Sequence, residues 1–419
     1  MVLEIRLSNF YSIKDEIILD MRAAKIKNAQ AQNLKNNIFS FNDIDVLKTA
    51  ILYGANASGK SNIIKAIRFC NAMVFESHNH NENSIFNFKP FKFQNSSNET
   101  STYFIRFVSN NVEYEYSFEL TQTQIVTETL HYYPKGRIAE IFTRDERKGK
   151  NKKDKYTFQA VIKRPWDVVE NTSDKTLFLS RASQMDRDIA KELFNYFNST
   201  FILGYLNKNH LESMFFEYKS TLLQALKIAD SDIVDIKIKK EKRELPNYAI
   251  TLLPNDIDVK KNYSGGYERL KLLTYHNASP DIPFDFETEE STGTQNLFYI
   301  MLNIIDIIIN GKILLIDEID KSLHPEIIDY ILNLFKASNK AQLICTTHNT
   351  SFLDLKKFRK DQIYFVNKKD DASTELYSLY DYSDFRENMD LEKAYLQGRF
   401  DAIPFVDDSF ENLKSIIDE

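Results

Sequence analysis

The sequence is poor in glycine, cysteine and long apolar runs. It has ten glycines, one tryptophan and two cysteines in 419 residues. Cys70 and Cys345 both lie inside apolar stretches, so we predict buried free thiols in a reducing compartment and no disulfide. The most apolar run, residues 297–309, is interrupted by Asn303 and Asp306 and is too short to span a bilayer. Because the N-terminus also lacks a signal-peptide pattern, we expect a cytoplasmic protein without a membrane segment.

A strong charge of one sign is missing as well. The chain has 60 acidic and 54 basic residues, and its net charge is -6. This balance argues against a surface that coats nucleic acid, although a local basic groove stays compatible with it. The length and the hydrophobic share of 43% fit two or three globular domains, or one domain with a large insertion.

Two of the rare glycines lie together in GANASGKS, residues 54–61, which matches the pattern G-x-x-x-x-G-K-[ST] in full. A buried strand is predicted over 46–54 before it, and a helix over 60–75 after it. Small residues let a phosphate chain approach successive backbone N–H groups, and the start of the helix directs further N–H groups at it. Lys60 would reach the β- and γ-phosphates, and Ser61 would hold Mg²⁺. The alternative is a glycine turn that matches the pattern by chance.

Two later apolar segments end in polar residues suited to phosphate chemistry. KILLIDE delivers Asp317 and Glu318 at the carboxyl end of a predicted buried strand, where ligands bind in open α/β sheets. Asp317 would bind Mg²⁺ through water, and Glu318 would polarise the attacking water as a general base. LICTTH ends in His348, which would hydrogen-bond the γ-phosphate and sense its loss. The alternative for His348 is a loop histidine without a role.

The segment EESTGTQ, residues 289–295, places Ser291 and Gly293 at the start of a helix predicted over about 294–309. With the following amides, they would form a second anion site. One chain has no evident need for two such sites, whereas a face-to-face dimer would use the second to cap the γ-phosphate that its partner holds. A plain helix N-cap at Ser291 or Thr292 is the alternative.

The order of the predicted elements indicates an α/β protein with a mostly parallel sheet flanked by helices. Within it, a hairpin is predicted over 102–120 around the turn SNN. The basic stretch 144–155 is predicted to be a solvated, mobile loop, and a nucleic-acid contact is the alternative. Residues 177–230 are predicted to be helical, with a strand at 248–253 after them. A tail is predicted after the strand QIYFVNK, residues 362–368.

The four motifs, in this order, resemble the Walker A loop, signature, Walker B strand and switch histidine of the ATP-binding-cassette (ABC) superfamily. The N-terminal IRLSNFYSIKDE and the loop GANASGKSN are similar to the branch with the SMC-type and RecF-type DNA-maintenance ATPases. More narrowly, ESTGTQ, LLIDEIDKSLHP, TTHNTSFLD, RKDQIYFVNK and KAYLQGRFDAIPF resemble bacterial AAA-family ATPase subunits of abortive-infection and phage-defence systems. These are relatives of the OLD, Septu and PARIS ATPases. The resemblance covers 1–75 and 285–405 with specific motifs, and the middle only loosely.

The resemblance implies roles for individual residues and ATP with Mg²⁺ as the ligands. The nucleotide loop would comprise Gly54, Asn56, Ala57, Ser58, Gly59, Lys60, Ser61 and Asn62. Ser291 and Gly293 would bind the nucleotide held by the partner, and Ser61 and Asp317 would hold the metal. Catalysis would rest on Glu318 as the base, His348 as the switch and Lys60.

The sequence departs from the family pattern in several places. The signature reads STGTQ where LSGGQ is usual, and IDKSLHP follows Glu318 where transporters have a Ser-Ala-Leu-Asp loop. The glutamine that usually contacts Mg²⁺ is not clearly placed; Gln94 is the candidate, and a turn glutamine is the alternative. SIK at 12–14 would contact the nucleotide base or ribose, or would simply end a strand.

The implied fold is a P-loop ABC-ATPase head with an N-terminal antiparallel β subdomain and a mixed helical and β insertion between Walker A and the signature. The predicted ranges are 1–75 for the N-terminal part of the head, 76–165 for the antiparallel β subdomain, 166–284 for a mostly helical insertion and 285–419 for the C-terminal part of the head.

The implied function is an ATP-binding and ATP-hydrolysing switch of an antiviral, abortive-infection system. It would dimerise around ATP, as a homodimer or a larger assembly of dimers. It would respond to a phage-encoded trigger and control a separate effector, a nuclease or toxin, because no nuclease-like acid cluster follows His348. The alternative is a DNA-repair or maintenance ATPase of RecF or SMC type, against which the acidic charge and the lack of a long coiled coil argue. A transporter ATPase fits less well, because of the large insertion.

Overall fold

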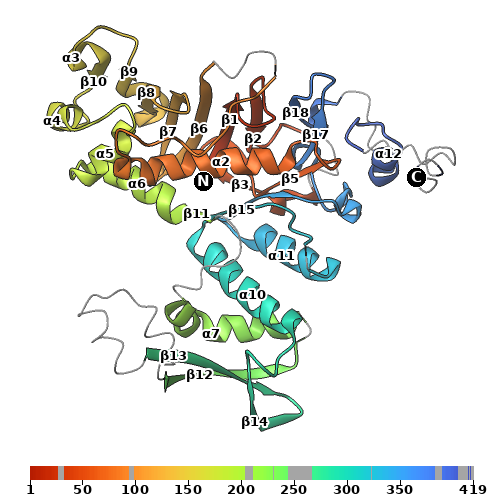
Figure 1. The fold of residues 1–419 in the computed structure, drawn as a ribbon. Helices are drawn as coiled ribbons and strands as arrows, with labels where there is room; N and C mark the ends of the chain where they lie inside the picture. Colours follow the sequence, from red (N-terminus) through yellow and green to blue (C-terminus); the bar gives the residue numbers. More distant parts are fainter. Residues whose placement is uncertain are drawn as a thin grey trace. The chain divides into compact units, whose positions relative to one another are not determined.

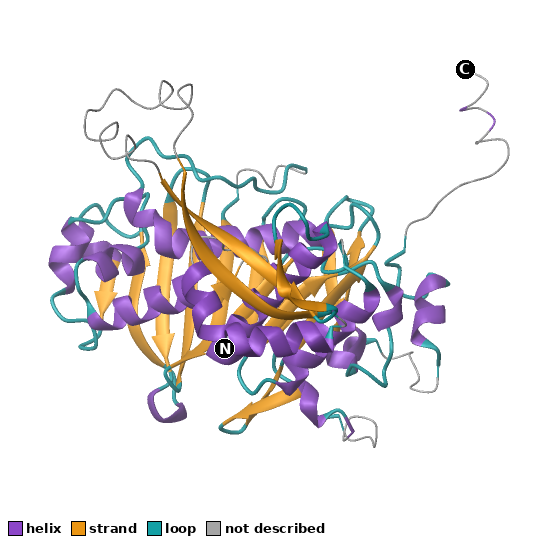
Figure 2. Cartoon of the chain, turned by 90° about the horizontal axis from the view of Figure 1, so that it is seen from below, coloured by secondary structure: helices purple, strands orange, loops and turns teal. Residues whose placement is uncertain are grey.

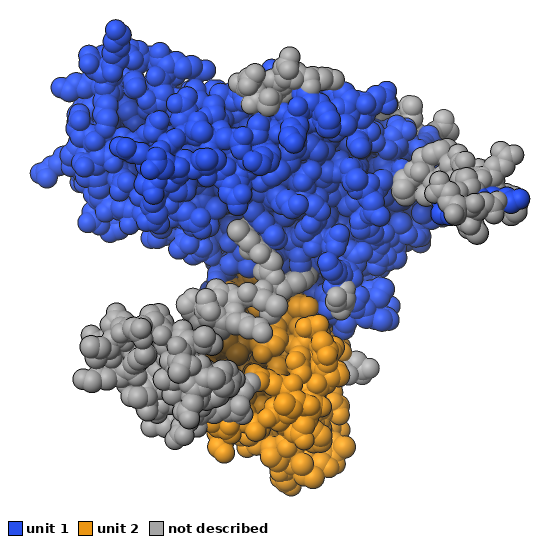
Figure 3. Space-filling model, viewed as in Figure 1, with its two compact units in different colours: residues 1–204, 310–419 blue, residues 205–309 orange. Residues whose placement is uncertain are grey.

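The structure is a computed structural model that describes residues 1–26, 33–93, 99–202, 211–229, 231–243, 267–321, 323–382 and 389–403, with Lys414 and Ile416. Gln94 and the strand predicted at 248–253 lie outside the described residues. The chain divides into two compact units, one of residues 1–204 and 310–419 and the other of residues 205–309. Figure 3 colours the two units separately.

The first unit contains a seven-stranded antiparallel sheet (Figure 1). Its order is β10 (Tyr156–Phe158), β9 (Ala139–Asp145), β8 (Ile125–Tyr132), β7 (Val112–Leu120), β6 (Ser101–Ser109), β1 (Val2–Ser8) and β2 (Ile17–Asp20). The predicted hairpin is confirmed, because β6 pairs with β7 across Asn110 and Asn111, which both have positive φ. Since β1 pairs with β6, the structure joins segments that the predicted ranges 1–75 and 76–165 had separated.

The second sheet of the first unit is mostly parallel, as predicted. Its order is β11 (Phe201–Ile202), β15 (Ile313–Ile316), β16 (Gln342–Thr346), β5 (Thr49–Gly54), β17 (Ile363–Lys368) and β18 (Thr374–Ser378). The first five strands run parallel, and only β18 is antiparallel to its neighbour. Strands β15, β16 and β5 are buried along their whole length, which explains why they are mostly apolar, with buried polar residues only at the ends of β16 and β5. β18 corrects the prediction of a plain tail after β17.

The first unit also contains helices, and Figure 2 distinguishes the helices of the chain from its strands by colour. The helices of the first unit are α2 (Lys60–Glu76), α3 (Lys152–Lys155), α4 (Pro165–Glu170), α5 (Phe178–Gln184), α6 (Asp188–Thr200), α11 (Pro325–Ala337) and α12 (Leu391–Leu396). The α/β fold class is therefore confirmed.

The apolar stretch 46–54 forms two strands, which corrects the single strand predicted there. β4 (Ile44–Leu47) pairs with β3 (Ile38–Phe41) in a separate small sheet, whereas β5 enters the parallel sheet. The break falls at Lys48, whose buried ammonium donates to the carbonyl of Lys336 over 2.7 Å. The two strands therefore differ in their pairing partners, and the polar Lys48 lies between them.

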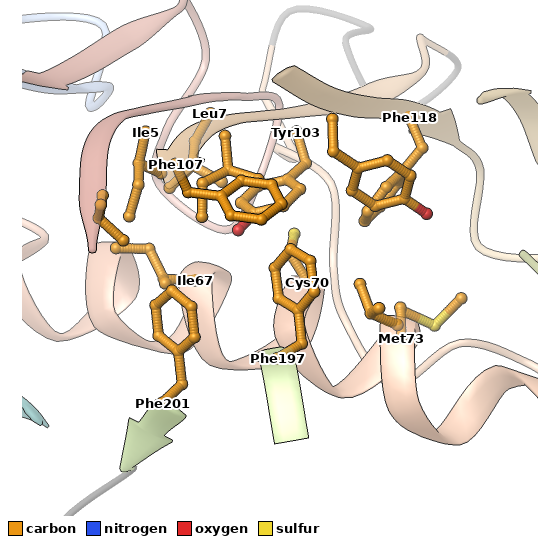
Figure 4. Close-up of a cluster of buried hydrophobic side chains, with 14 of the residues drawn as sticks. Ile5, Leu7, Ile67, Cys70, Met73, Tyr103, Phe107, Phe118, Phe197 and Phe201 are labelled. Atoms are coloured by element: carbon orange, nitrogen blue, oxygen red, sulfur yellow. The ribbon is translucent and has the colours of Figure 1, made fainter. Parts of the chain in front are cut away.

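One hydrophobic core connects the antiparallel sheet with α2 and α6. Figure 4 shows Ile67, Cys70 and Met73 of α2 facing Phe107 and Tyr103 of the sheet. These side chains are at most 3% exposed. The two cysteines are buried and free, in agreement with the prediction. Helix α2 is thus anchored over its length, and its first residue, Lys60, belongs to the predicted phosphate-binding loop.

The basic stretch 144–155 is only partly a solvated loop, which corrects the prediction. Arg144 ends up fully buried in β9, 3.8 Å from the buried carboxylate of Glu128. Its guanidinium also donates to the carbonyls of Thr176 and Ser173. A buried charge persists only when it is paired and hydrogen-bonded in this way. Glu146, two residues further on, also pairs with Arg144 over 2.7 Å, but the groups that bury its guanidinium come from distant parts of the chain, so sequence patterns cannot find it.

The second unit combines helices with an antiparallel sheet. Its described elements are α7 (Leu211–Ile228), β12 (Ile233–Arg243), β13 (Tyr267–His276), β14 (Ser279–Asp285) and α10 (Thr292–Asn310). Among the described residues of 166–284, helices predominate up to Ile228, and the strands β12, β13 and β14 follow. By length and composition α10 could cross a membrane, but 44% of its most apolar window is buried, and core helices of soluble proteins pass the same test.

Candidate functional site

The predicted phosphate-binding loop connects β5 to α2, and two glycines determine its shape. Gly54 lies opposite Val366 in the pairing of β5 with β17, and a Cβ atom at Gly54 would collide with the Val366 carbonyl. Gly59 has a φ of 110°, and a Cβ atom there would collide with the hydroxyl of Thr374. A residue without a side chain is therefore required at both positions.

A chain of hydroxyl groups supports this loop from behind. The Asn62 amide donates to Ser12 Oγ over 2.8 Å, and Ser12 Oγ lies 2.7 Å from the hydroxyl of Thr374. Thr374 in turn donates to the carbonyl of Ser58 over 2.9 Å. Asn62 and Ser12 therefore brace the loop. Sequence reasoning missed Thr374, because it lies more than 300 residues from the loop and carries no local signal.

Lys60 is held against the loop that it follows. Its ammonium donates to the carbonyls of Gly54 over 2.7 Å and of Ala55 over 3.0 Å, and the residue is 6% exposed. Burial lowers its pKa, and the carboxylates of Asp317, Glu318 and Asp320 act in the opposite direction. The Lys60 ammonium is thus in the field of the acidic groups that follow β15.

The remaining loop residues differ in exposure. Ser58 is buried, Ser61 and Asn62 are half-buried, and Asn56 and Ala57 are exposed. Ala57 has a φ of 63°, so the exposed tip adopts the left-handed conformation.

Asp317 and Glu318 follow β15 directly, as the sequence predicted, and Thr346 of β16 holds both. The Thr346 hydroxyl donates to Asp317 Oδ1 over 2.6 Å and accepts the backbone N–H of Glu318 over 2.7 Å. Glu318 has a φ of 53°, a strained conformation for a residue with a side chain. The hydrogen bond from its N–H to Thr346 holds this strained backbone in place. Sequence reasoning missed Thr346.

His348 follows β16, and Asp320 links it to the acidic segment. The backbone N–H of His348 donates to Asp320 Oδ2 over 3.2 Å, while the His348 side chain is exposed. Asp320 Oδ1 is buried and has no hydrogen-bond partner among the described residues. Asp320 was not among the predicted site residues, although its place in DEID was a usable signal.

These groups meet at one edge of the parallel sheet. β15, β16 and β5 are consecutive neighbours and parallel, so the segments after Ile316, Thr346 and Gly54 leave the sheet at the same edge. The predicted loop, acidic pair and histidine come together there. This arrangement defines a P-loop ATPase head of the ABC type, with the antiparallel sheet and an insertion as predicted.

The chain belongs to the family described as "AAA domain, putative AbiEii toxin, Type IV TA system", whose model matches residues 50–354. The match agrees with the resemblance to ATPases of abortive-infection systems. No curated protein matches the chain.

Two solved structures of SMC heads are similar to it. One is an SMC head bound to the C-winged helix domain of ScpA, with 14% identity and a TM-score of 0.40 over 94% of this chain and 99% of that one. The other is an SMC head domain from Thermotoga maritima, with 16% identity and a TM-score of 0.37 over 90% and 98% of the two chains.

The predicted signature residues lie in the second unit, at the start of α10. Ser291 Oγ accepts the backbone N–H of Thr294 over 3.1 Å, so Ser291 caps the helix. Gly293 is exposed, and a Cβ atom there would meet only Ser291 Oγ, at 3.6 Å. Gln295 fixes the preceding turn, because its amide donates to the carbonyls of Glu287 and Glu290. Ser291 can cap the helix and still line the predicted anion site, because the start of α10 remains exposed.

Replacing Thr346 by valine should lower kcat about tenfold while ATP affinity changes little, because one hydrogen bond to a charged group is lost beside the acidic pair. Steady-state ATPase assays and a nucleotide-binding titration measure the two effects. Thr346→Ser keeps the hydroxyl and should retain near-normal turnover. A valine variant with wild-type kcat would show that Thr346 does not organise this pair.

Proposed function

We propose that this chain is the ATP-binding and ATP-hydrolysing switch subunit of an antiviral, abortive-infection defence system. It dimerises around ATP and controls a separate effector, a nuclease or toxin, in response to a phage-encoded trigger. The observation that carries the ATPase part is the convergence of Lys60, the Asp317–Glu318 pair and His348 at one sheet edge. Membership in a family named for a toxin–antitoxin system supports the defence context.

The residues at this edge fit a triphosphate and Mg²⁺. The loop from Gly54 to Gly59 leads into the N-terminus of α2, where backbone N–H groups favour anions. Mg²⁺ keeps several waters and is bound by one or two carboxylates plus phosphate oxygens, so it needs no larger cluster of side-chain ligands. Ser61 and Asp317 would hold the ion, which would neutralise phosphate charge.

The chain's own groups can then carry the hydrolysis. Glu318, whose side chain is 43% exposed, accepts a proton from water as the water oxygen bonds to the γ-phosphorus. The bond from that phosphorus to the bridging oxygen breaks, and ADP leaves with its electron pair. Lys60 compensates the charge on the phosphate oxygens, and its contact with the loop carbonyls keeps it close to them.

Dimerisation would complete the site. In this proposal Ser291 and Gly293 of a second copy cap the γ-phosphate held by the first copy, with the exposed start of α10 as the contact. Closure assembles the catalytic groups, and loss of the γ-phosphate releases the two copies. The state of the dimer is what an effector would sense.

The test is to co-express the chain with the products of its flanking genes and to measure the purified assembly by native mass spectrometry with and without ATP. We expect a flanking protein to co-purify, the number of copies per assembly to rise with ATP, and phage plaque counts to fall only when both genes are intact. A chain that stays monomeric with ATP, with no partner and no effect on phage, would refute the proposal. Salt-dependent DNA binding with DNA-stimulated turnover would instead support the DNA-maintenance alternative.

A further inference from the structure

The turn that leads into α10 is fixed by a buried carboxylate beside the signature serine. Glu290 directly precedes Ser291, and its side chain is 7% exposed. Its Oε1 atom accepts the hydroxyl of Thr274 and lies 2.8 Å from Nε2 of His276. A nearly buried negative charge therefore sits one residue from the proposed anion site.

His276 connects this carboxylate to a second one. Its Nδ1 atom lies 2.9 Å from Asp232 Oδ1, before β12, and its ring packs against Phe284 of β14 at 4.7 Å between centroids. Asp232 and Glu290 are the charged groups that face the ring among the described residues. A neutral imidazole has a single N–H, so only the protonated ring can donate to both carboxylates at once.

The electrostatics favour that cation. Burial disfavours the charge, but the hydrogen bonds and charges of Asp232 and Glu290 outweigh it and raise the pKa of His276 above its ordinary value of 6.5. The cation is therefore present at lower pH and is lost as the pH rises through this raised pKa.

We infer that protonated His276 is a positioning residue for the signature turn, where it holds and neutralises Glu290 so that Ser291 and Gly293 can receive the anionic phosphate of a second copy. This inference rests on the proposed ATP-dependent dimer. An uncompensated carboxylate next to the site would repel the triphosphate, and it would also release the turn that carries Ser291. Neither His276 nor Glu290 has to contact the nucleotide.

The test uses the Glu318→Gln chain, in which hydrolysis is expected to be blocked, and measures its ATP-dependent dimer constant from pH 6 to pH 9. We expect dimerisation to weaken as the pH rises. Adding His276→Gln should weaken the dimer about tenfold at the low-pH end, within the usual range of coupling between sites. Adding Glu290→Gln, alone or together with His276→Gln, should remove the pH dependence and restore the dimer to within about twofold, because no charge is left to neutralise.

Two controls separate the possible failures. ATP binding by the monomer depends on the Walker A loop and should be the same in all these variants, which also reports on folding. If the histidine variant dimerises like its parent at every pH, or if Glu290→Gln does not rescue it, the inference is wrong. If the parent forms no dimer with ATP at any pH, the proposed function fails instead.

Discussion

Replacing Glu318 by glutamine is expected to lower ATP turnover by at least about 10²-fold, the scale of general base catalysis, and to leave ATP bound in a long-lived dimer. The glutamine has nearly the same shape, and its backbone N–H can still donate to Thr346, so the strained turn after β15 should be retained. What is lost is the carboxylate proposed to take a proton from water, next to Asp317, the proposed Mg²⁺ ligand.

Phosphate-release assays measure the turnover, and size-exclusion chromatography with light scattering measures the dimer. Glu326→Gln is a matched control, because Glu326 is exposed on the first turn of α11 and should leave both quantities unchanged. Normal turnover in Glu318→Gln would remove Glu318 from the role of base, and attention would then turn to Asp320.

Replacing Lys60 by alanine is expected to weaken ATP binding by at least about 10²-fold, which is the usual cost of removing one member of a buried charge contact. Lys60 is 6% exposed, and its ammonium lies against the carbonyls of Gly54 and Ala55 and is close enough to Asp317 for their charges to interact. No other lysine follows the loop so closely, so a neighbour cannot replace it.

Isothermal titration with a non-hydrolysable ATP analogue measures this affinity. Lys65→Ala provides the control. Lys65 is exposed and lies further along α2, and its replacement removes the same charge from the chain. If the Lys60 variant binds the analogue as tightly as wild type, the loop serves a structural purpose and the proposed nucleotide site is wrong.

Most of the predicted nucleotide loop could be derived from the sequence, because the residues that determine its conformation are neighbours in the chain. A buried strand, a turn with two glycines and a helix are adjacent in the chain, so 54–61 specifies its own conformation. The same holds for Asp317 and Glu318, which follow a short apolar strand. The sequence could not show that β4 and β5 are separate strands, because the break at Lys48 depends on which strands pair with each side.

The supporting residues could not be predicted for the same reason. Thr374 braces the loop from β18, and Thr346 joins the acidic pair from β16. The buried guanidinium of Arg144 donates to two carbonyls about 30 residues away. Threonine and arginine are common at exposed positions, so nothing in their local sequence distinguishes these three. His276 and Glu290 likewise meet only because β13 runs beside the turn before α10.

The sequence by itself determined the chemistry that is available: which residues can hold phosphate, metal and a proton, and in what order they occur along the chain. Only the tertiary structure decided which of them share an edge of the sheet and which hydroxyls and carboxylates orient them. The reason is that a motif is written in contiguous residues, whereas hydrogen bonds and burial depend on segments that the fold brings together from hundreds of residues apart.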